Sequence, residues 1–236
     1  MSSKPVKTFV LVPGAWHGAW AWRPVERLLR ALGHEVLAIT LTGVAERAHL
    51  LSPAVRLETH VRDVAQAIEV EDLRGVTLVG HSYGGMVITP AAARVPGRIA
   101  ELVYLDAFVP KPGESMLDLM KAKYSDSWRS RAKKESNGLS VPVMLDATAM
   151  GLSGSAAAAV DAKLTPHPMA TLEDKAEFDE KAITAVPKRF IRCSAYAGFK
   201  PWAEKAAAWG WPVENLDAGH DGMLIAPRAL ADLLVR

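Results

Sequence analysis

The segment Leu78–Gly85, which reads LVGHSYGG, is the sequence feature that most constrains the fold of this chain. It follows a run of apolar residues and precedes a segment with helical spacing, so the chain must turn sharply from a strand into a helix around Ser82. Gly80 and Gly84, placed two residues before and after the serine, permit a tight turn that a β-carbon would obstruct. The pattern predicts that the Ser82 hydroxyl projects clear of the edge of a sheet.

Strand-sized apolar runs alternate with segments of helical spacing along the chain. Between the runs, apolar residues recur at helical spacing, and one such stripe ends at Gly33, which predicts a helix cap. The alternation predicts an α/β fold with a mainly parallel central sheet, helices on both faces, and ligands bound beyond the carboxyl ends of the strands. The predicted strands are Thr8–Val12, Glu35–Ile39, Val76–Val79, Leu102–Leu105, Arg189–Cys193 and Val213–Leu216.

Between residues 111 and 188 the alternation lapses, and the composition shifts toward Met, Ala, Lys and Asp. Helical pieces are expected at Glu114–Tyr124 and Ser153–Ala162. No Gly/Ser-rich linker divides the 236 residues into two halves that could each form a core. We therefore expect residues 1–110 and 189–236 to form the α/β core and residues 111–188 to form a small inserted helical cap.

Charge and cysteine content exclude several classes of partner. The formal net charge is +2 and the basic residues are scattered, so we expect no nucleic-acid partner, and we interpret the basic run Arg129–Lys134 as a solvated helix face. Cys193 is the only cysteine, which suits a buried core position and permits a reducing compartment. The polar N-terminal segment MSSKPVKT does not resemble a signal peptide or a membrane span. We expect a cytoplasmic protein without a membrane partner, and a homo-oligomer remains open.

A serine nucleophile needs a base within hydrogen-bond reach and donors for the oxyanion that forms on attack. His220, in the segment DAGHDG after the last predicted strand, is expected at the same end of the sheet as Ser82. The amide of Tyr83, directly after the serine, is the first candidate oxyanion donor. The second is the amide of Ala15 in the turn PGAWHG, with Trp16 as the competing assignment.

Five segments carry a resemblance to a known family: VPGAWHGAWAW, LVGHSYGGMV, LVYLDAFVP, LTPHPMAT and LDAGHDGML. Together they resemble the α/β-hydrolase subgroup that contains hydroxynitrile lyases, plant methylesterases and related bacterial esterases. The resemblance spans nearly the whole chain. It implies a helical cap over a buried Ser-His-Asp site, assigns Ser82 and His220 to that site, and implies that no cofactor is needed.

The catalytic acid is the point at which this chain departs from the subgroup. The subgroup usually carries its aspartate shortly after the strand that here spans residues 189–193, and Tyr196 stands at that position. A phenol stays neutral near pH 7 and cannot offset an imidazolium charge as a carboxylate does. Asp106, at the end of the strand that follows the nucleophile helix, is the preferred replacement, ahead of Asp221, Asp217 and a dyad without an acid.

The expected reaction is serine-dependent hydrolysis of small to medium apolar carboxylic esters through an acyl-enzyme intermediate. Trp16, Trp128, Met120 and Met144 are candidate pocket residues, and no metal is expected because the histidines lack ligand spacing. Two alternatives remain: a ligand-binding protein with little turnover, and a hydroxynitrile lyase. The lyases of the subgroup use a threonine and a lysine where this chain has Gly14 and Asp221, which disfavours that activity.

Overall fold

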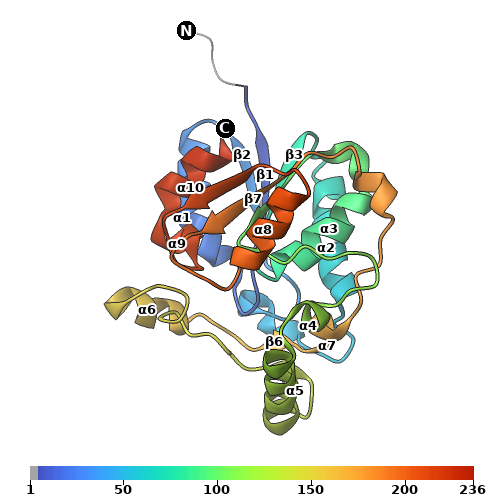
Figure 1. Cartoon of the computed structure of the whole chain (residues 1–236), viewed down its shortest axis with the longest axis vertical. Helices are drawn as coiled ribbons and strands as arrows, with labels where there is room; N and C mark the ends of the chain where they lie inside the picture. Colours follow the sequence, from blue (N-terminus) through green and yellow to red (C-terminus); the bar gives the residue numbers. More distant parts are fainter. Residues whose placement is uncertain (1–4) are drawn as a thin grey trace.

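The computed structural model describes residues 5–236, and its centre is a sheet of parallel strands (Figure 1). The strand order is β2-β1-β3-β4-β7-β8. The predicted strands are all present and differ only at their ends, and the predicted α/β fold with helices on both faces is confirmed. The strands are β1 (Thr8–Val12), β2 (Glu35–Ala38), β3 (Val76–His81), β4 (Ile99–Leu105), β7 (Lys188–Cys193) and β8 (Val213–Leu216).

Helices cover the two faces of the sheet in separate groups (Figure 1). One face packs against α1 (Arg23–Ala31), α9 (Gly222–Ile225) and α10 (Pro227–Leu234). The opposite face packs against α2 (Leu57–Val70), α3 (Gly84–Arg94) and α8 (Lys200–Ala208). Short 3-10 helices span Ala19–Trp22, Ala45–Leu50, Pro96–Arg98 and Glu180–Ile183.

The central strand β3 shows why an uninterrupted apolar run forms here. Each of its residues is buried, because helices cover both faces of the sheet. Successive side chains point to opposite faces, so Leu78 joins the core beneath α2 and α3, whereas Val79 joins the core beneath α1 and α10. Each such side chain stabilises the fold by about 1.5–3 kcal/mol through removal from water.

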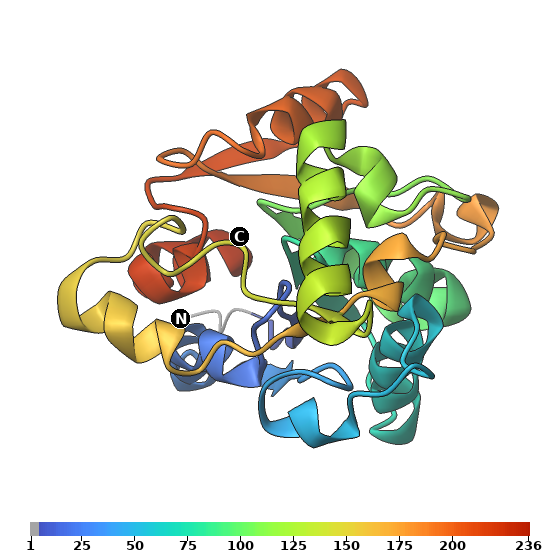
Figure 2. The same ribbon diagram turned by 90° about the horizontal axis from the view of Figure 1, so that it is seen from below.

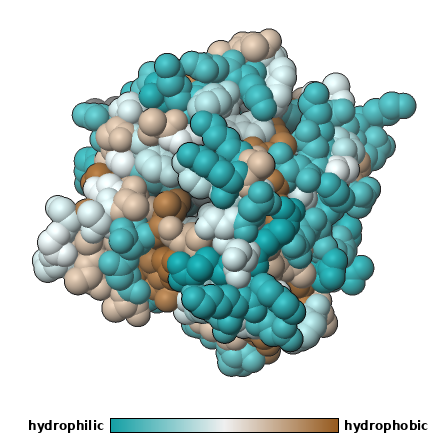
Figure 3. Space-filling model, turned by 60° about the horizontal axis from the view of Figure 1, so that its bottom comes forward, coloured by the Kyte–Doolittle hydropathy of each residue, from teal (hydrophilic) through white to brown (hydrophobic). Residues whose placement is uncertain are grey.

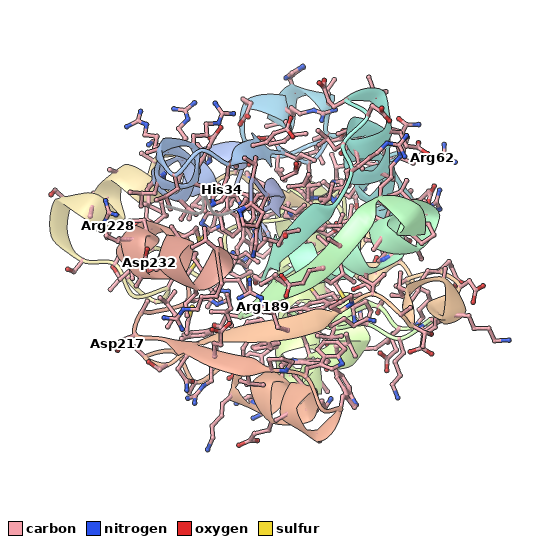
Figure 4. The ribbon with its side chains drawn as sticks, turned by 90° about the horizontal axis from the view of Figure 1, so that it is seen from above. His34, Arg62, Arg189, Asp217, Arg228 and Asp232 are labelled. Atoms are coloured by element: carbon pink, nitrogen blue, oxygen red, sulfur yellow. The ribbon has the colours of Figure 1, made fainter. Side chains whose placement is uncertain are left out.

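Arg189 at the start of β7 is a buried charge with a full set of partners. Its guanidinium donates to Glu101 at 2.9 Å, to Glu214 at 2.8 Å and to the carbonyls of Leu233 and Leu234 in α10. A buried charge is tolerated when it is paired and hydrogen-bonded in this way. The side chain lies at the end of the sheet opposite the carboxyl ends of the strands (Figure 4), where it ties α10 to β4 and β8.

The chain between β4 and β7 forms an insertion at the carboxyl ends of the strands (Figures 1 and 2). It contains α4 (Met116–Leu119), α5 (Ala122–Ser136), β5 (Ser140–Val141), α6 (Gly154–Asp161), β6 (His167–Pro168) and α7 (Ala170–Glu173), and β5 and β6 form an antiparallel pair. Seen from below, α5 crosses the ends of the strands (Figure 2). No helix of residues 5–236 has the length and apolar character needed to span a bilayer. The boundaries of the cap stay a prediction.

One predicted helical piece of the insertion is divided in two. The expected helix Glu114–Tyr124 is interrupted at Met120, whose ψ of 159° is extended, so that α4 ends and α5 begins within the predicted range. Ser115 caps the start of α4 in a reciprocal pair with Asp118. The predicted piece Ser153–Ala162 corresponds to α6.

Candidate active site

The turn at Ser82 requires a backbone conformation that few residues adopt. Ser82 has φ of +53°, in the left-handed region, and its amide donates to the carbonyl of Leu105 at 3.2 Å. A β-carbon on Gly80 would lie 2.8 Å from the carbonyl oxygen of Gly84, and one on Gly84 would lie 2.8 Å from that of Val12. The two glycines are therefore needed for the close approach of strand, helix and first turn, and the side chain of Ser82 remains half-buried.

The structure brings three of the predicted site residues into one hydrogen-bonded chain. His220 Nε2 lies 3.0 Å from Ser82 Oγ, and His220 Nδ1 lies 2.9 Å from Asp106 Oδ2. The second carboxylate oxygen of Asp106 accepts the Cys193 amide at 3.2 Å. A carboxylate only accepts hydrogen bonds, so it fixes the His220 proton on Nδ1 and leaves Nε2 free to accept the serine proton.

Asp106 is held by the sheet itself. His81 of β3 pairs with Leu105 of β4. Ser82 is the residue directly after His81, and Asp106 is the residue directly after Leu105. The residue has φ of +43° and is fully buried. Burial raises the pKa of the Asp106 carboxyl, and the hydrogen bonds from His220 and the Cys193 amide offset this effect only in part.

Tyr196, at the position where the subgroup usually has its acid, contacts His220 with its ring. The ring centroids lie 4.7 Å apart, and Phe199 stacks on the same imidazole at 5.0 Å with an interplanar angle of 4°. Burial raises the pKa of the Tyr196 phenol, which keeps it neutral. Tyr196 and Phe199 therefore form an aromatic wall against His220, while Nδ1 of the imidazole faces Asp106.

The two other candidate acids lie elsewhere. Asp217 is exposed at the edge of the molecule (Figure 4), where Ser194 donates to it at 3.4 Å.

Asp221 is fully buried and lies 3.3 Å from Nε2 of His17, whose Nδ1 donates to the Ala15 carbonyl at 2.8 Å. Burial would lower the pKa of His17, but Asp221 outweighs it and leaves that pKa raised. Burial would likewise raise the pKa of Asp221, but His17 leaves it lowered.

The substitution Asp221→Asn is expected to shift the pKa of His17 below 6.5, because burial then acts without a carboxylate partner. The raised pKa of His17 stabilises the fold below pH 6.5 and this contribution is lost as pH rises through the folded value. The lowered pKa of Asp221 stabilises it above pH 3.8 and this contribution is lost on acidification. Urea unfolding should show a loss of about 1–3 kcal/mol near pH 5.5 and a smaller one at pH 9. Equal losses at both pH values would contradict the assignment of the pair.

Two backbone amides near Ser82 are without acceptors in the part of the chain that the structure describes: those of Ala15 and Tyr83. The competing candidate, the Trp16 amide, donates to Nδ1 of His167 at 3.4 Å. The first turn lies directly against the serine, since a β-carbon on Gly14 would be 2.9 Å from Ser82 Cβ.

Buried histidines surround the site, and sequence reasoning did not foresee two of them, His60 and His167. His81 donates from Nε2 to the His220 carbonyl at 3.0 Å, which holds the loop that carries the candidate base. His60 and His167 contact the Tyr83 ring. The HP pair within LTPHPMAT was the only local signal for His167, and Trp16 and Tyr83, which it contacts, lie far away in sequence. Within residues 5–236, no three His, Cys, Asp or Glu side chains are arranged to hold a metal ion.

The predicted pocket residues lie in the insertion or pack against it. Trp16 and Trp128 of α5 are buried against each other, with ring centroids 5.2 Å apart, while Met120 and Met144 are partly buried against the same core. The face that carries the insertion has a small hollow bordered by hydrophobic side chains (Figure 3). Cavities of about 450 and 520 Å³ lie elsewhere, the first beside Tyr104 and the second beside Arg56, Asp174 and other residues distant from Ser82.

Comparisons with known proteins place the chain in a known family. The family model described as the alpha/beta hydrolase family matches residues 9–233. A carbendazim hydrolyzing esterase of Nocardioides sp. (strain SG-4G) is 38% identical over 96% of this chain and 97% of that protein. Methylesterase 2 of Arabidopsis thaliana is 36% identical over 43% of this chain and 40% of that protein. An extracellular alpha/beta-hydrolase from a Paenibacillus species superposes with a TM-score of 0.86 at 26% identity, covering 98% of both chains. This chain therefore belongs to the alpha/beta hydrolase family.

Proposed function

We propose that the protein is a serine-dependent carboxylic ester hydrolase that acts on small to medium apolar esters through an acyl-enzyme intermediate. The observation that supports this most is the continuous hydrogen-bonded chain from Ser82 through His220 to Asp106. It joins a nucleophile on a strained turn, a base and a buried carboxylate, which is the arrangement that acyl transfer requires. The esterase names of the relatives point to the same chemistry.

In the first step, Ser82 Oγ passes its proton to His220 Nε2 and attacks the ester carbonyl. The imidazolium that forms is offset by the Asp106 carboxylate. The oxyanion accepts hydrogen bonds from the amides of Ala15 and Tyr83, neither of which has an acceptor within residues 5–236. His220 then gives the proton to the leaving alcohol, and a water activated by the same base releases the acid.

The assignment of Ala15 rather than Trp16 to the oxyanion rests on what the Trp16 amide already does. Its proton points at Nδ1 of His167, so it could serve an oxyanion only by giving up that bond. A buried acceptor left unsatisfied costs about 1–3 kcal/mol. The Ala15 amide carries no such cost.

We assign residues 111–188 to a cap that covers the site and shapes the acyl or alcohol pocket. The Trp16 and Trp128 rings, which pack at an interplanar angle of 53°, join the first turn to α5, so this apolar wall belongs to both parts. Met120 and Met144 add flexible apolar surface suited to varied esters. The lone buried thiol of Cys193 is compatible with the cytoplasmic location that we also propose.

The lyase alternative is disfavoured at both of its diagnostic positions. A β-carbon at position 14 would lie 2.9 Å from both His81 Nδ1 and Ser82 Cβ, so a threonine there would need the turn to shift. Asp221 is paired with His17, so it does not supply the positive charge with which a lysine at this position would stabilise cyanide.

A fluorophosphonate probe tests the proposal through the nucleophile itself. We expect stoichiometric labelling, with the adduct mapped to Ser82 by peptide mass spectrometry, and loss of p-nitrophenyl butyrate hydrolysis in step with labelling. Because one relative is named for hydrolysing carbendazim, that compound is the first further substrate to assay. Labelling at another residue would overturn the proposal, and labelling of Ser82 without turnover of any ester would favour the ligand-binding alternative.

A further inference from the structure

The peptide unit between Ala15 and Trp16 is held at both of its polar ends. The Ala15 carbonyl accepts Nδ1–H of His17 at 2.8 Å, and the Trp16 amide donates to Nδ1 of His167 at 3.4 Å. The insertion holds the next peptide as well, since the Thr165 amide donates to the Trp16 carbonyl at 3.2 Å. Because a peptide unit is planar, these bonds fix the plane that follows Ala15. The Ala15 amide lies in the preceding plane, which is joined to this one through the φ and ψ angles of Ala15, so holding the one plane limits the directions in which that amide can point.

Trp16 needs this support because its own backbone is strained. Its φ of +67° lies in the left-handed region, which a bulky side chain rarely adopts. Such a conformation persists only where the surroundings determine it. Here the surroundings are two residues of the insertion, Thr165 and His167, together with Trp128 of α5, which packs on the Trp16 ring.

The protonation state of His167 follows from its partners. An amide can only donate, so Nδ1 of His167 accepts from Trp16 and the ring proton sits on Nε2, which donates to Thr171 Oγ1 at 3.0 Å. The Thr171 hydroxyl in turn donates to the Pro168 carbonyl at 2.8 Å, so it is free to accept. Burial keeps the pKa of His167 well below its ordinary value, so the ring stays neutral and Nδ1 stays an acceptor.

His167 also contacts the side chain of Tyr83, whose amide is the other oxyanion donor. Its ring packs edge-to-face on the Tyr83 ring with centroids 4.7 Å apart, and the Tyr83 hydroxyl donates to Nδ1 of His60 at 2.9 Å. One side chain of the insertion therefore contacts the ring of Tyr83 and, through the Trp16 amide, the residue that directly follows Ala15.

We propose that His167 is a positioning residue that aims the Ala15 amide at the oxyanion, so that ester hydrolysis depends on the contact between the insertion and the first turn. This inference rests on the proposed function. It separates two roles of the insertion, because apolar side chains form the substrate wall whereas a single neutral imidazole acts on the transition state through the backbone.

Three variants test this inference. His167→Phe keeps a ring against Tyr83 and removes the acceptor, while His167→Asn places an oxygen near the position of Nδ1 and retains it. Val141→Ala is the matched control, since Val141 is the buried strand partner of His167 and contacts neither oxyanion amide by a hydrogen bond. Each variant is assayed for kcat and KM with p-nitrophenyl butyrate and for binding of an aliphatic trifluoromethyl ketone. Ser82 Oγ adds to that carbonyl, His220 takes the proton, and the carbonyl oxygen becomes the oxyanion.

We expect His167→Phe to lower kcat by about 10- to 100-fold, short of the loss seen when an oxyanion donor is deleted, with KM within about twofold. Ketone affinity should fall by the same factor as kcat/KM. His167→Asn should recover most of both, and Val141→Ala should lower thermal stability without a matching loss of ketone affinity. Unchanged kcat in His167→Phe, a change confined to KM, or equal losses in His167→Phe and Val141→Ala would overturn the inference while the esterase stands. Absence of wild-type turnover would overturn the proposed function, and this inference with it.

Discussion

Ser82→Ala is expected to lower kcat for p-nitrophenyl butyrate by about four to six orders of magnitude. The loss is large because the variant lacks the hydroxyl that forms the acyl-enzyme and that lies 3.0 Å from His220 Nε2. What remains would be the catalysis that the oxyanion donors and binding supply to a direct attack by water. The residual kcat is measured in stopped assays that run for hours, on samples whose folded fraction is matched by circular dichroism.

Ser194→Ala is the matched control for the serine. Ser194 is exposed and its hydroxyl donates to the Leu216 carbonyl at 3.2 Å, away from His220 Nε2. We expect its kcat to stay within about twofold of the wild type, since exposed substitutions away from a site rarely matter. If Ser82→Ala kept a substantial share of the wild-type kcat, the serine mechanism would be wrong whatever the geometry suggests.

Asp106→Asn is expected to lower kcat by about three to four orders of magnitude with little change in KM. The amide is nearly the same size as the carboxylate, but it carries no charge to offset the imidazolium. It can also present its NH₂ group to His220 Nδ1, which favours the tautomer with the proton on Nε2, the nitrogen that must accept from Ser82. The pH profile of kcat/KM and the rate at the plateau together measure both effects.

Tyr196→Phe separates this explanation from one in which the phenol serves as the third group. The variant keeps the ring against His220 and removes only the hydroxyl, so we expect kcat within about threefold of the wild type. A large loss in Tyr196→Phe combined with a small loss in Asp106→Asn would transfer the role to the phenol. Small losses in both variants would favour a dyad of Ser82 and His220.

The fold was predictable because its determinants are local. The apolar run of β3 is buried between two helical layers, and the glycines on both sides of Ser82 permit the close approach of strand and helix at the turn. The break between α4 and α5 was not predictable in this way. The residues around Met120 suit a continuous helix, and tertiary packing of the insertion decides where that helix divides.

The site was predictable in part. Ser82 and His220 stand in motifs whose spacing in the chain reflects their role, whereas the bond between His220 and Asp106 joins residues 114 positions apart. Only the register of β3 against β4 brings Asp106 beside the serine. The contact of Trp16 with His167 spans 151 positions, and neither residue carries a local signal for the other.

The pairing of β3 with β4 has a consequence for how this chain can be altered. Ser82 and Asp106 directly follow two residues that are paired in the sheet. The sheet therefore fixes their relative position, which does not depend on the loop after β7. That loop does not supply the catalytic carboxylate, and it carries Tyr196 and Phe199 instead. Over evolutionary time, or in a directed-evolution library, residues 194–199 are therefore open to changes that an acid in the same loop would forbid, provided that aromatic side chains still pack on His220.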